Sequence, residues 1–244
     1  MNSKIKSSGK QQAEQFTQMC QYLGLKHLAS EYPQILDQAG KDDPGYYEFI
    51  RQIILSETAA KKKRRVEYLV RQSRLPQPLK MLNSFDFDFQ KKLDRRLVMD
   101  LSSMEFIERK ESILFIGNNG TGKSHLAQSL GLTACHKGYK TYYTTCSELI
   151  RDLNQGVYEK TLEKRIKKYI NTELLLIDEM GHDRLELQVI KEAHLLFKVI
   201  DQRYKENKSL IFTSNIEEED WPEFLGDPIS TSAILDRIFH HSVI

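Results

Sequence analysis

One glycine-rich stretch of the sequence carries the residue types that a phosphate site needs. It runs GNNGTGKSH from Gly117 to His125, follows four apolar residues and precedes a helix-like segment, and it fits the pattern G-x-x-x-x-G-K-[ST]. Glycines let backbone N–H groups converge on an anion, and the amino end of the next helix adds unpaired amides and a positive dipole end. The pattern therefore predicts a phosphate-binding loop. The alternative, a glycine-rich turn with a chance lysine, does not account for the strand and helix that flank it.

The same loop predicts which groups would meet a nucleotide and its metal ion. Lys123 is expected to reach the β- and γ-phosphates, and the Ser124 hydroxyl is expected to ligate Mg²⁺. The predicted nucleotide-binding residues are Gly117, Asn118, Asn119, Gly120, Thr121, Gly122, Lys123, Ser124 and His125.

Two neighbouring acids end the apolar segment LLLI. Asp178 and Glu179 follow it directly, and in an open parallel sheet ligands lie beyond the carboxyl ends of the strands. Asp178 is predicted to hold the Mg²⁺ shell with Ser124, and Glu179 to polarise the attacking water, which separates a hydrolase from a binding protein. A solvated acidic strand end is the alternative. However, the sequence separation between Lys123 and Asp178 leaves room for one intervening strand with its helices, which is typical of one subclass of phosphate-loop proteins.

Two further polar residues could complete a catalytic site. Asn215 ends the segment SLIFTSN and could touch the γ-phosphate or the water, or it could cap a helix beginning near EEEDW. The stretch STSAILDRIFHHSVI is predicted to be an amphipathic helix, and Arg237 supplies its guanidinium, which could be offered to a neighbouring subunit's γ-phosphate. A salt bridge within the subunit, to Asp236 or another acid, is nearly as well supported by spacing alone.

The elements that must position these residues alternate along the second half of the chain. Strands are expected at 112–116, 141–144, 174–178 and 210–213, and helices at 123–136, 147–153, 162–170 and 187–204. Short apolar strands separated by helices predict a parallel sheet covered on both faces. The predicted fold is therefore α/β, a three-layer P-loop NTPase sheet, with a small N-terminal all-helical domain.

Composition and the positions of helix-breaking residues predict how the chain is divided into domains. Its 244 residues are 40% hydrophobic with a net charge of +2, which suits one core plus a small accessory domain and argues against a surface built wholly for nucleic acid. A helical N-terminal domain is expected at 1–75, a connector at 76–96 that docks through Phe85, Phe87 and Phe89, and the core at 97–244. Three cysteines without paired spacing, and no visible signal peptide, predict a soluble cytoplasmic protein.

Four motifs in order resemble those of the IstB-type transposition helper ATPases, AAA+ proteins similar to DnaC-type helicase loaders. They are GNNGTGKSHLA, LLLIDEMG, TSN followed by Trp221, and SAILDRIFHH; the FDF before the core, the pair Arg203–Tyr204 and the N-terminal stretch CQYLGLKHLASEY also fit. The resemblance covers nearly the whole chain. It implies an ATPase that forms a homo-oligomer around DNA in ATP and helps an IstA-type DDE transposase to choose its target. It also implies a sensor role for Asn215 and a trans-acting role for Arg237.

The sequence departs from the family pattern in two places. Asn118 and Asn119 replace a proline-containing loop common in the family, although backbone amides can still bind there. The chain ends at Ile244, where family members usually continue, so the C-terminus is apparently short. If the coding region is shortened, weak assembly or weak hydrolysis is expected.

A basic run is the main candidate for DNA contact. Lys61, Lys62, Lys63, Arg64 and Arg65 lie together on one predicted helix, with Arg71 and Arg74 at its end. A solvated helix face is the alternative, and the family resemblance favours DNA. Because nothing here reads bases, sequence-tolerant binding to the phosphate backbone is predicted. A second basic segment, with Lys164, Arg165, Lys167 and Lys168, is a weaker candidate.

Three other functions remain open at this level. A replicative helicase loader differs from a transposition helper mainly in its protein partner. A small-molecule kinase should carry an arginine-rich insertion after the phosphate loop, and none is visible. A nucleotide-binding copy with little hydrolysis is the third.

Overall fold

The computed structural model describes residues 2–90, 93–180, 189–225, 228–239 and 242–243. Its contacts separate the chain into two compact units, Met1–Glu67 and Tyr68–Ile244. The functional division inferred from the sequence, with boundaries at 75 and 96, stays a prediction. Over the described residues, no helix has both the length and the apolar character needed to cross a membrane.

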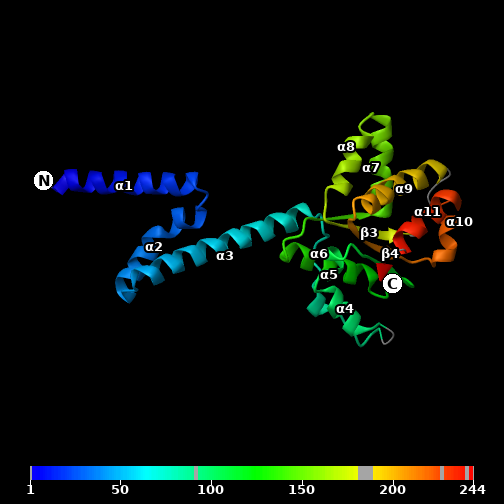
Figure 1. Cartoon of the computed structure of the whole chain (residues 1–244), viewed down its shortest axis with the longest axis horizontal. Coiled ribbons are helices and arrows are strands. Elements are labelled where there is room, and N and C mark those ends of the chain that lie inside the picture. The colour runs from blue at the N-terminus through cyan, green and yellow to red at the C-terminus, as the bar shows by residue number, and fades with distance from the viewer. Residues whose placement is uncertain (1, 91–92, 181–188, 226–227, 240–241, 244) are drawn as a thin grey trace. The chain divides into compact units, whose positions relative to one another are not determined.

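The first unit is built from helices. They are α1 (Asn2–Tyr22), α2 (Lys26–Asp42) and the first part of α3 (Tyr46–Gln72) (Figure 1). A buried carboxylate on α3 ties two of them together, because Glu57 accepts the N–H of Leu28 in the first turn of α2 at 2.8 Å and the Arg64 guanidinium at 2.9 Å. Burial raises the pKa of Glu57, but the Leu28 amide and Arg64 outweigh it and hold the pKa below its usual value. One cation of the basic run therefore has a structural partner.

The second unit is organised around a parallel five-stranded sheet. Its strands are β1 (Ser112–Ile116), β2 (Thr141–Thr145), β3 (Leu174–Met180), β4 (Ser209–Ser214) and β5 (Ser242–Val243), in the order β2-β3-β4-β1-β5 (Figure 1). The four predicted strands are confirmed. The fifth was missed: the sequence suggested that the last helix continued to the C-terminus, but Val243 pairs with Ile113 of β1 instead. Two residues are too few to show a strand pattern.

Helices cover both faces of the sheet, as predicted. They are α4 (Arg95–Leu101), α5 (Glu105–Glu108), α6 (Lys123–His136), α7 (Cys146–Tyr158), α8 (Leu162–Ile170), α9 (Val189–Lys205), α10 (Trp221–Leu225) and α11 (Pro228–Phe239), with short 3₁₀ turns η1 (Leu82–Ser84) and η2 (Glu218–Asp220). The α7 helix runs five residues beyond the predicted end at 153, and the predicted start of α9 at 187 lies outside the described residues.

The alternation of side chains along β3 divides the core into two layers. Leu174 and Leu176 pack with Leu130 of α6 on one face, whereas Leu175 and Ile177 pack with the helices α7, α8, α9 and α11 on the other. All four strand residues are fully buried, which is expected for a central parallel strand. The three-layer α/β fold predicted from the sequence is confirmed.

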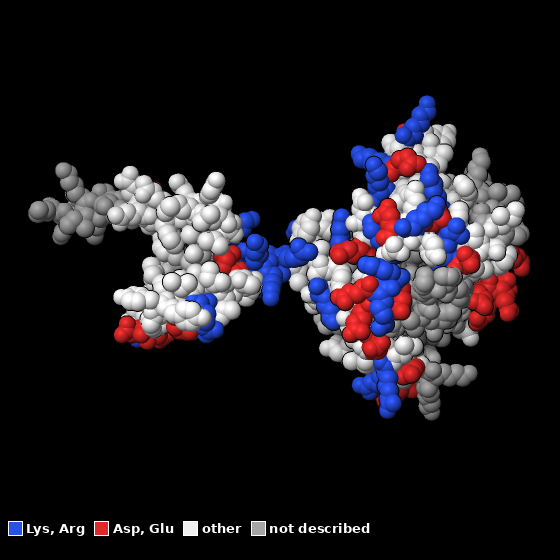
Figure 2. Space-filling model, in the orientation of Figure 1, with Lys and Arg blue, Asp and Glu red and all other residues white. Residues whose placement is uncertain are grey.

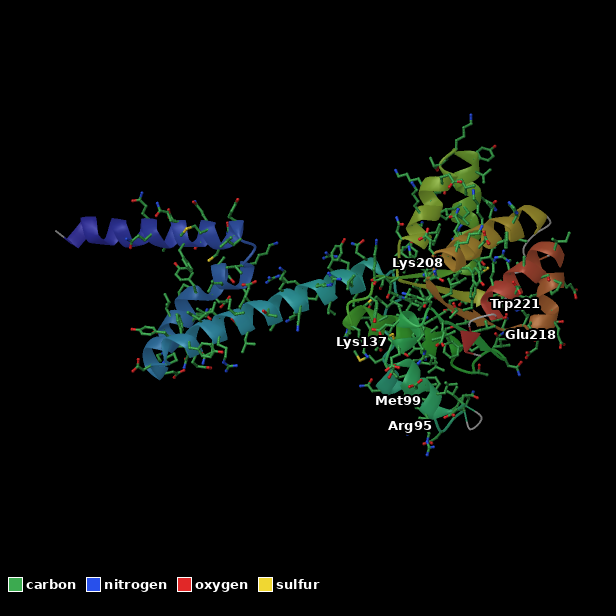
Figure 3. The ribbon with its side chains drawn as sticks, viewed as in Figure 1. Arg95, Met99, Lys137, Lys208, Glu218 and Trp221 are labelled. Carbon is green, nitrogen blue, oxygen red and sulfur yellow. The ribbon has the colours of Figure 1, made fainter. Side chains whose placement is uncertain are left out.

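Two large buried residues hold the elements around the sheet. The Arg203 guanidinium is fully buried and donates to the carbonyls of Tyr169 at 2.6 Å, Thr172 at 3.0 Å and Ser209 at 2.6 Å. It thereby satisfies carbonyls where α8 ends, and their partial negative charge offsets the cost of a buried cation. Burial lowers the pKa of Arg203 to about 9. Trp221, labelled in Figure 3 at the start of α10, is fully buried beside Phe212 of β4, with ring centroids 6.3 Å apart.

Candidate nucleotide site

The phosphate loop joins β1 to α6 and depends on one glycine for two independent reasons. Gly122 has a φ of 92°, in the left-handed region that side chains disfavour. A Cβ atom at Gly122 would also lie 2.6 Å from the ring of Phe85. The loop conformation and the packed ring therefore both require glycine at this position.

The amino group of Lys123 lies folded across the loop. Its Nζ donates to the carbonyls of Gly117 at 2.6 Å and Asn118 at 2.8 Å. Burial lowers the pKa of Lys123, and the negative charge of Asp178 only partly opposes this. Among the described residues, no carboxylate forms a salt bridge with Lys123, and a bound anion would stabilise its ammonium group.

Asp178 is the centre of a hydrogen-bond network at the carboxyl edge of the sheet. It is 1% exposed and accepts the Ser124 hydroxyl at 2.8 Å and the Tyr143 hydroxyl at 2.8 Å. The Thr213 hydroxyl of β4 donates to the same carboxylate. The structure thus brings together the two residues, Ser124 and Asp178, that were predicted to hold a metal ion.

Glu179 stands apart from the rest of β3 because the strand is irregular there. The pairing of β3 with β4 shifts register between Ile177 and Met180, and Glu179 has a φ of 61°. For a residue other than glycine this conformation costs about 1–2 kcal/mol. The Glu179 N–H donates to the Thr213 hydroxyl at 3.0 Å and to Asp178 at 3.1 Å, which supports the conformation. As a result, the Glu179 side chain is exposed between two buried neighbours.

These groups surround a cavity of about 350 Å³. It is lined by Asn119, Gly120, Gly122, Lys123, Ser124, His125, Glu179, Thr213 and Asn215. Asn215 donates its N–H to the Met180 carbonyl at 3.2 Å, but its buried Oδ1 has no hydrogen-bond partner among the described residues. The helix-capping alternative for Asn215 is not seen, since η2 begins after Glu217 without a side-chain cap. An unpaired amide oxygen in the same cavity as Lys123 and Ser124 fits a site for a triphosphate and its metal.

The segment before the core docks on the phosphate loop through aromatic rings. Phe85 packs edge-on against His125 at 5.3 Å and against Phe87 at 4.9 Å between centroids. The His125 Nε2 lies 3.0 Å from the Met81 carbonyl, which joins the same segment to α6. Phe89 is 71% exposed, so the expectation that it also docks is wrong. Phe85 and Phe87 form the aromatic contacts of this segment.

Arg237 does not line this cavity. Its Nε donates to Asp201 of α9 at 2.7 Å, and its guanidinium lies 5.0 Å from the centroid of the Phe197 ring. The intrasubunit salt bridge considered from spacing is therefore present, with Asp201 as its acid rather than Asp236. Whether the same arginine serves a neighbouring subunit stays a prediction.

The basic run of α3 divides by exposure. Lys61, Lys62 and Lys63 are exposed, whereas Arg64 is half-buried against Glu57, and Arg65 is exposed but engaged in an interaction. Figure 2 shows lysine and arginine side chains gathered along the second half of α3.

The second basic segment lies on α8 and is partly neutralised. Arg165 and Lys168 both pair with Asp152 of α7, while Lys164 and Lys167 are exposed. Half of its cations therefore have structural partners.

Three residues of the Asp178 network were missed by the sequence analysis. Thr213 stands beside the predicted Asn215 in the motif TSN, and that position at a strand end was a signal that could have been used. Tyr143 and Gln128 had no such signal, because only the pairing of β2 with β3 and the packing of α6 bring them to Asp178.

Comparison with solved structures defines the class of protein. AMPPCP-bound DnaA from Aquifex aeolicus matches 70% of this chain and 50% of its own, with a TM-score of 0.53 and 19% identity. DnaI matches 70% of this chain and 93% of its own, with a TM-score of 0.56 and 18% identity. The fold is that of an AAA+ P-loop protein.

Sequence relatives define the family. The family described as IstB-like ATP binding protein matches residues 18–244. The ATP-binding protein named for insertion sequence IS5376 of Geobacillus stearothermophilus is 37% identical over 95% of this chain and 90% of its own length. The one named for IS21 of Pseudomonas aeruginosa is 36% identical over 90% of this chain and 81% of its own length. The chain belongs to the IstB-like ATP-binding protein family.

Proposed function

We propose that this protein binds ATP with Mg²⁺, hydrolyses it, and assembles on DNA in the cytoplasm to help an IstA-type DDE transposase select its target. The observation that carries the proposal is the hydrogen bond between Ser124 and Asp178, with Glu179 turned out of the strand beside them. The insertion-sequence names of the relatives support the transposition role over that of a helicase loader.

The residues of the cavity suggest how hydrolysis would proceed. Lys123 would leave the two loop carbonyls and contact the terminal phosphates, while Ser124 and Asp178 would hold the metal. Mg²⁺ supplies neutralisation of the charge that develops on the phosphate oxygens. Glu179 would accept a hydrogen bond from the attacking water, and Asn215 would offer its unpaired Oδ1 to the water or its amide nitrogen to the phosphate.

The neighbourhood of Arg237 is compatible with a second role in an oligomer. Asp201 binds Arg237 through one oxygen and Lys205 through the other, at 2.7 and 2.6 Å. If Arg237 moved to a neighbour's phosphate, Asp201 would keep Lys205 and would not be left unpaired. We therefore infer that Arg237 acts in trans. Separately, we infer that residues 1–75, which contain the basic run, supply DNA or partner contacts.

ATP-dependent assembly is the direct test of this proposal. Light scattering after size exclusion should give the mass of one subunit without nucleotide and a multiple of it with ATP, Mg²⁺ and duplex DNA. Arg237→Ala should still bind ATP but assemble less. Arg109→Ala is the matched control, because Arg109 lines the same surface cavity as Arg237 and pairs with Glu111. A single-subunit mass under every condition would contradict the proposal.

The salt dependence of DNA binding tests the basic run. Changing Lys61, Lys62 and Lys63 to Gln should lower the slope of log affinity against log salt by about 0.9 for each lysine that contacts a duplex phosphate. Arg64 is left in place because it supports Glu57. The control changes three exposed lysines of the same unit outside the run, Lys10, Lys26 and Lys41, to Gln. An unchanged slope in the first variant would rule the run out as a DNA contact.

A further inference from the structure

We propose that Tyr143 is a positioning residue for Asp178, which orients the carboxylate so that one oxygen faces the phosphate loop. The inference rests on the proposed nucleotide function. It concerns a residue on a different strand from any of the motifs.

The two oxygens of Asp178 have different partners. Oδ1 accepts the Ser124 hydroxyl at 2.8 Å and also meets the Thr213 hydroxyl and the Glu179 N–H. Oδ2 accepts the Tyr143 hydroxyl at 2.8 Å, with the Gln128 amide farther away at 3.5 Å. The three partners of Oδ1 thus all line the cavity, whereas the two partners of Oδ2 do not.

Strand register explains why Tyr143 can reach this carboxylate. Tyr143 of β2 pairs with Leu176 of β3, and Asp178 lies two residues farther along the same face. Diagonal neighbours of this kind are within reach of an aromatic side chain. The N–H of Tyr143 is also fixed, since it donates to the carbonyl of Ser73 at 2.7 Å. Backbone and hydroxyl are therefore both held.

The chemistry of the phenol suits a permanent donor. Tyr143 is 8% exposed, so its hydroxyl is largely shielded from water and needs a hydrogen-bond partner within the protein. A carboxylate can only accept, so the phenol donates its proton to Oδ2 and the direction of this bond is set. Without it, Oδ2 would keep, among the described residues, only the longer bond from Gln128, so the orientation of the carboxylate would be held less firmly.

The test removes one hydroxyl and follows metal-dependent nucleotide binding rather than turnover. Titration of Mg²⁺ into Tyr143→Phe with a fluorescent ATP analogue should show half-maximal binding at a Mg²⁺ concentration about 10-fold to 100-fold higher than in wild type. Nucleotide affinity measured in EDTA should not change. Gln128→Met, which removes the weaker donor, should shift the Mg²⁺ midpoint in the same direction by less.

Tyr142→Phe is the matched control. It removes the neighbouring hydroxyl, which accepts a hydrogen bond from Arg74 at 2.9 Å on the other face of the strand, and should leave the Mg²⁺ midpoint unchanged. A wild-type midpoint in Tyr143→Phe would overturn the inference while leaving the proposed function intact, whatever Gln128→Met does. Absence of nucleotide binding in the wild type would overturn both.

Discussion

Glu179→Gln is expected to lower ATP turnover by about 100-fold to 10,000-fold while nucleotide binding persists, because the amide cannot take a proton or orient the water as a carboxylate does. Its side chain lines the cavity without forming part of the loop that would hold the phosphates. Phosphate release measured under saturating ATP and DNA provides the test. The substitution keeps the size of the side chain, so the unusual backbone at this position should be retained.

The same variant should accumulate as an ATP-bound oligomer on DNA. If hydrolysis loosens the subunit interface, a protein that cannot hydrolyse should sediment as a stable assembly long after the wild type has dissociated. Glu218→Gln, an exposed acid on η2 outside the cavity, is the control and should behave as wild type. Rapid dissociation of the Glu179→Gln oligomer would count against coupling between hydrolysis and release.

Lys123→Ala is expected to weaken ATP binding by about 100-fold or more, because a charged donor that would contact the terminal phosphates is lost. Calorimetric titration of magnesium–ATP should then show little heat. Folding should not suffer, since Lys123 is partly buried with a lowered pKa and contributes only two bonds to loop carbonyls.

The pH dependence of binding follows from the same lysine. Its pKa is lowered in the free protein and would be raised by a bound triphosphate, so binding takes up protons and affinity falls as pH rises through the lowered pKa. Lys137→Ala is the control: Lys137, labelled in Figure 3, directly follows the last residue of α6 and donates to the Ser103 carbonyl at 2.6 Å, and its loss should not affect binding. Tight ATP binding by Lys123→Ala would refute the assignment of the loop.

Much of the candidate site could be predicted because its parts are local in sequence. The loop from Gly117 to Ser124 spans a single turn between a strand and a helix, and the predicted bounds of that helix agree with α6. Asp178 and Glu179 were recognisable because two acids directly follow four apolar residues. In each case the functional side chains lie within a few residues of the strand or turn that positions them, and hydrophobic periodicity and turn preferences are readable over that range.

Pairing between distant segments decided the rest. Tyr143 contacts Asp178 only through the register of β2 with β3, and the Glu179 side chain is exposed where the pairing of β3 with β4 shifts register. Arg237 pairs with Asp201 because α11 packs on α9, and Val243 is part of a strand because it pairs with Ile113 of β1. The loop, the acids and the layered α/β class could all be predicted, since they depend on short-range patterns along the chain. Which side chains share the Asp178 carboxylate could not, because strand register and helix packing are set by the summed burial of many residues rather than by any one motif.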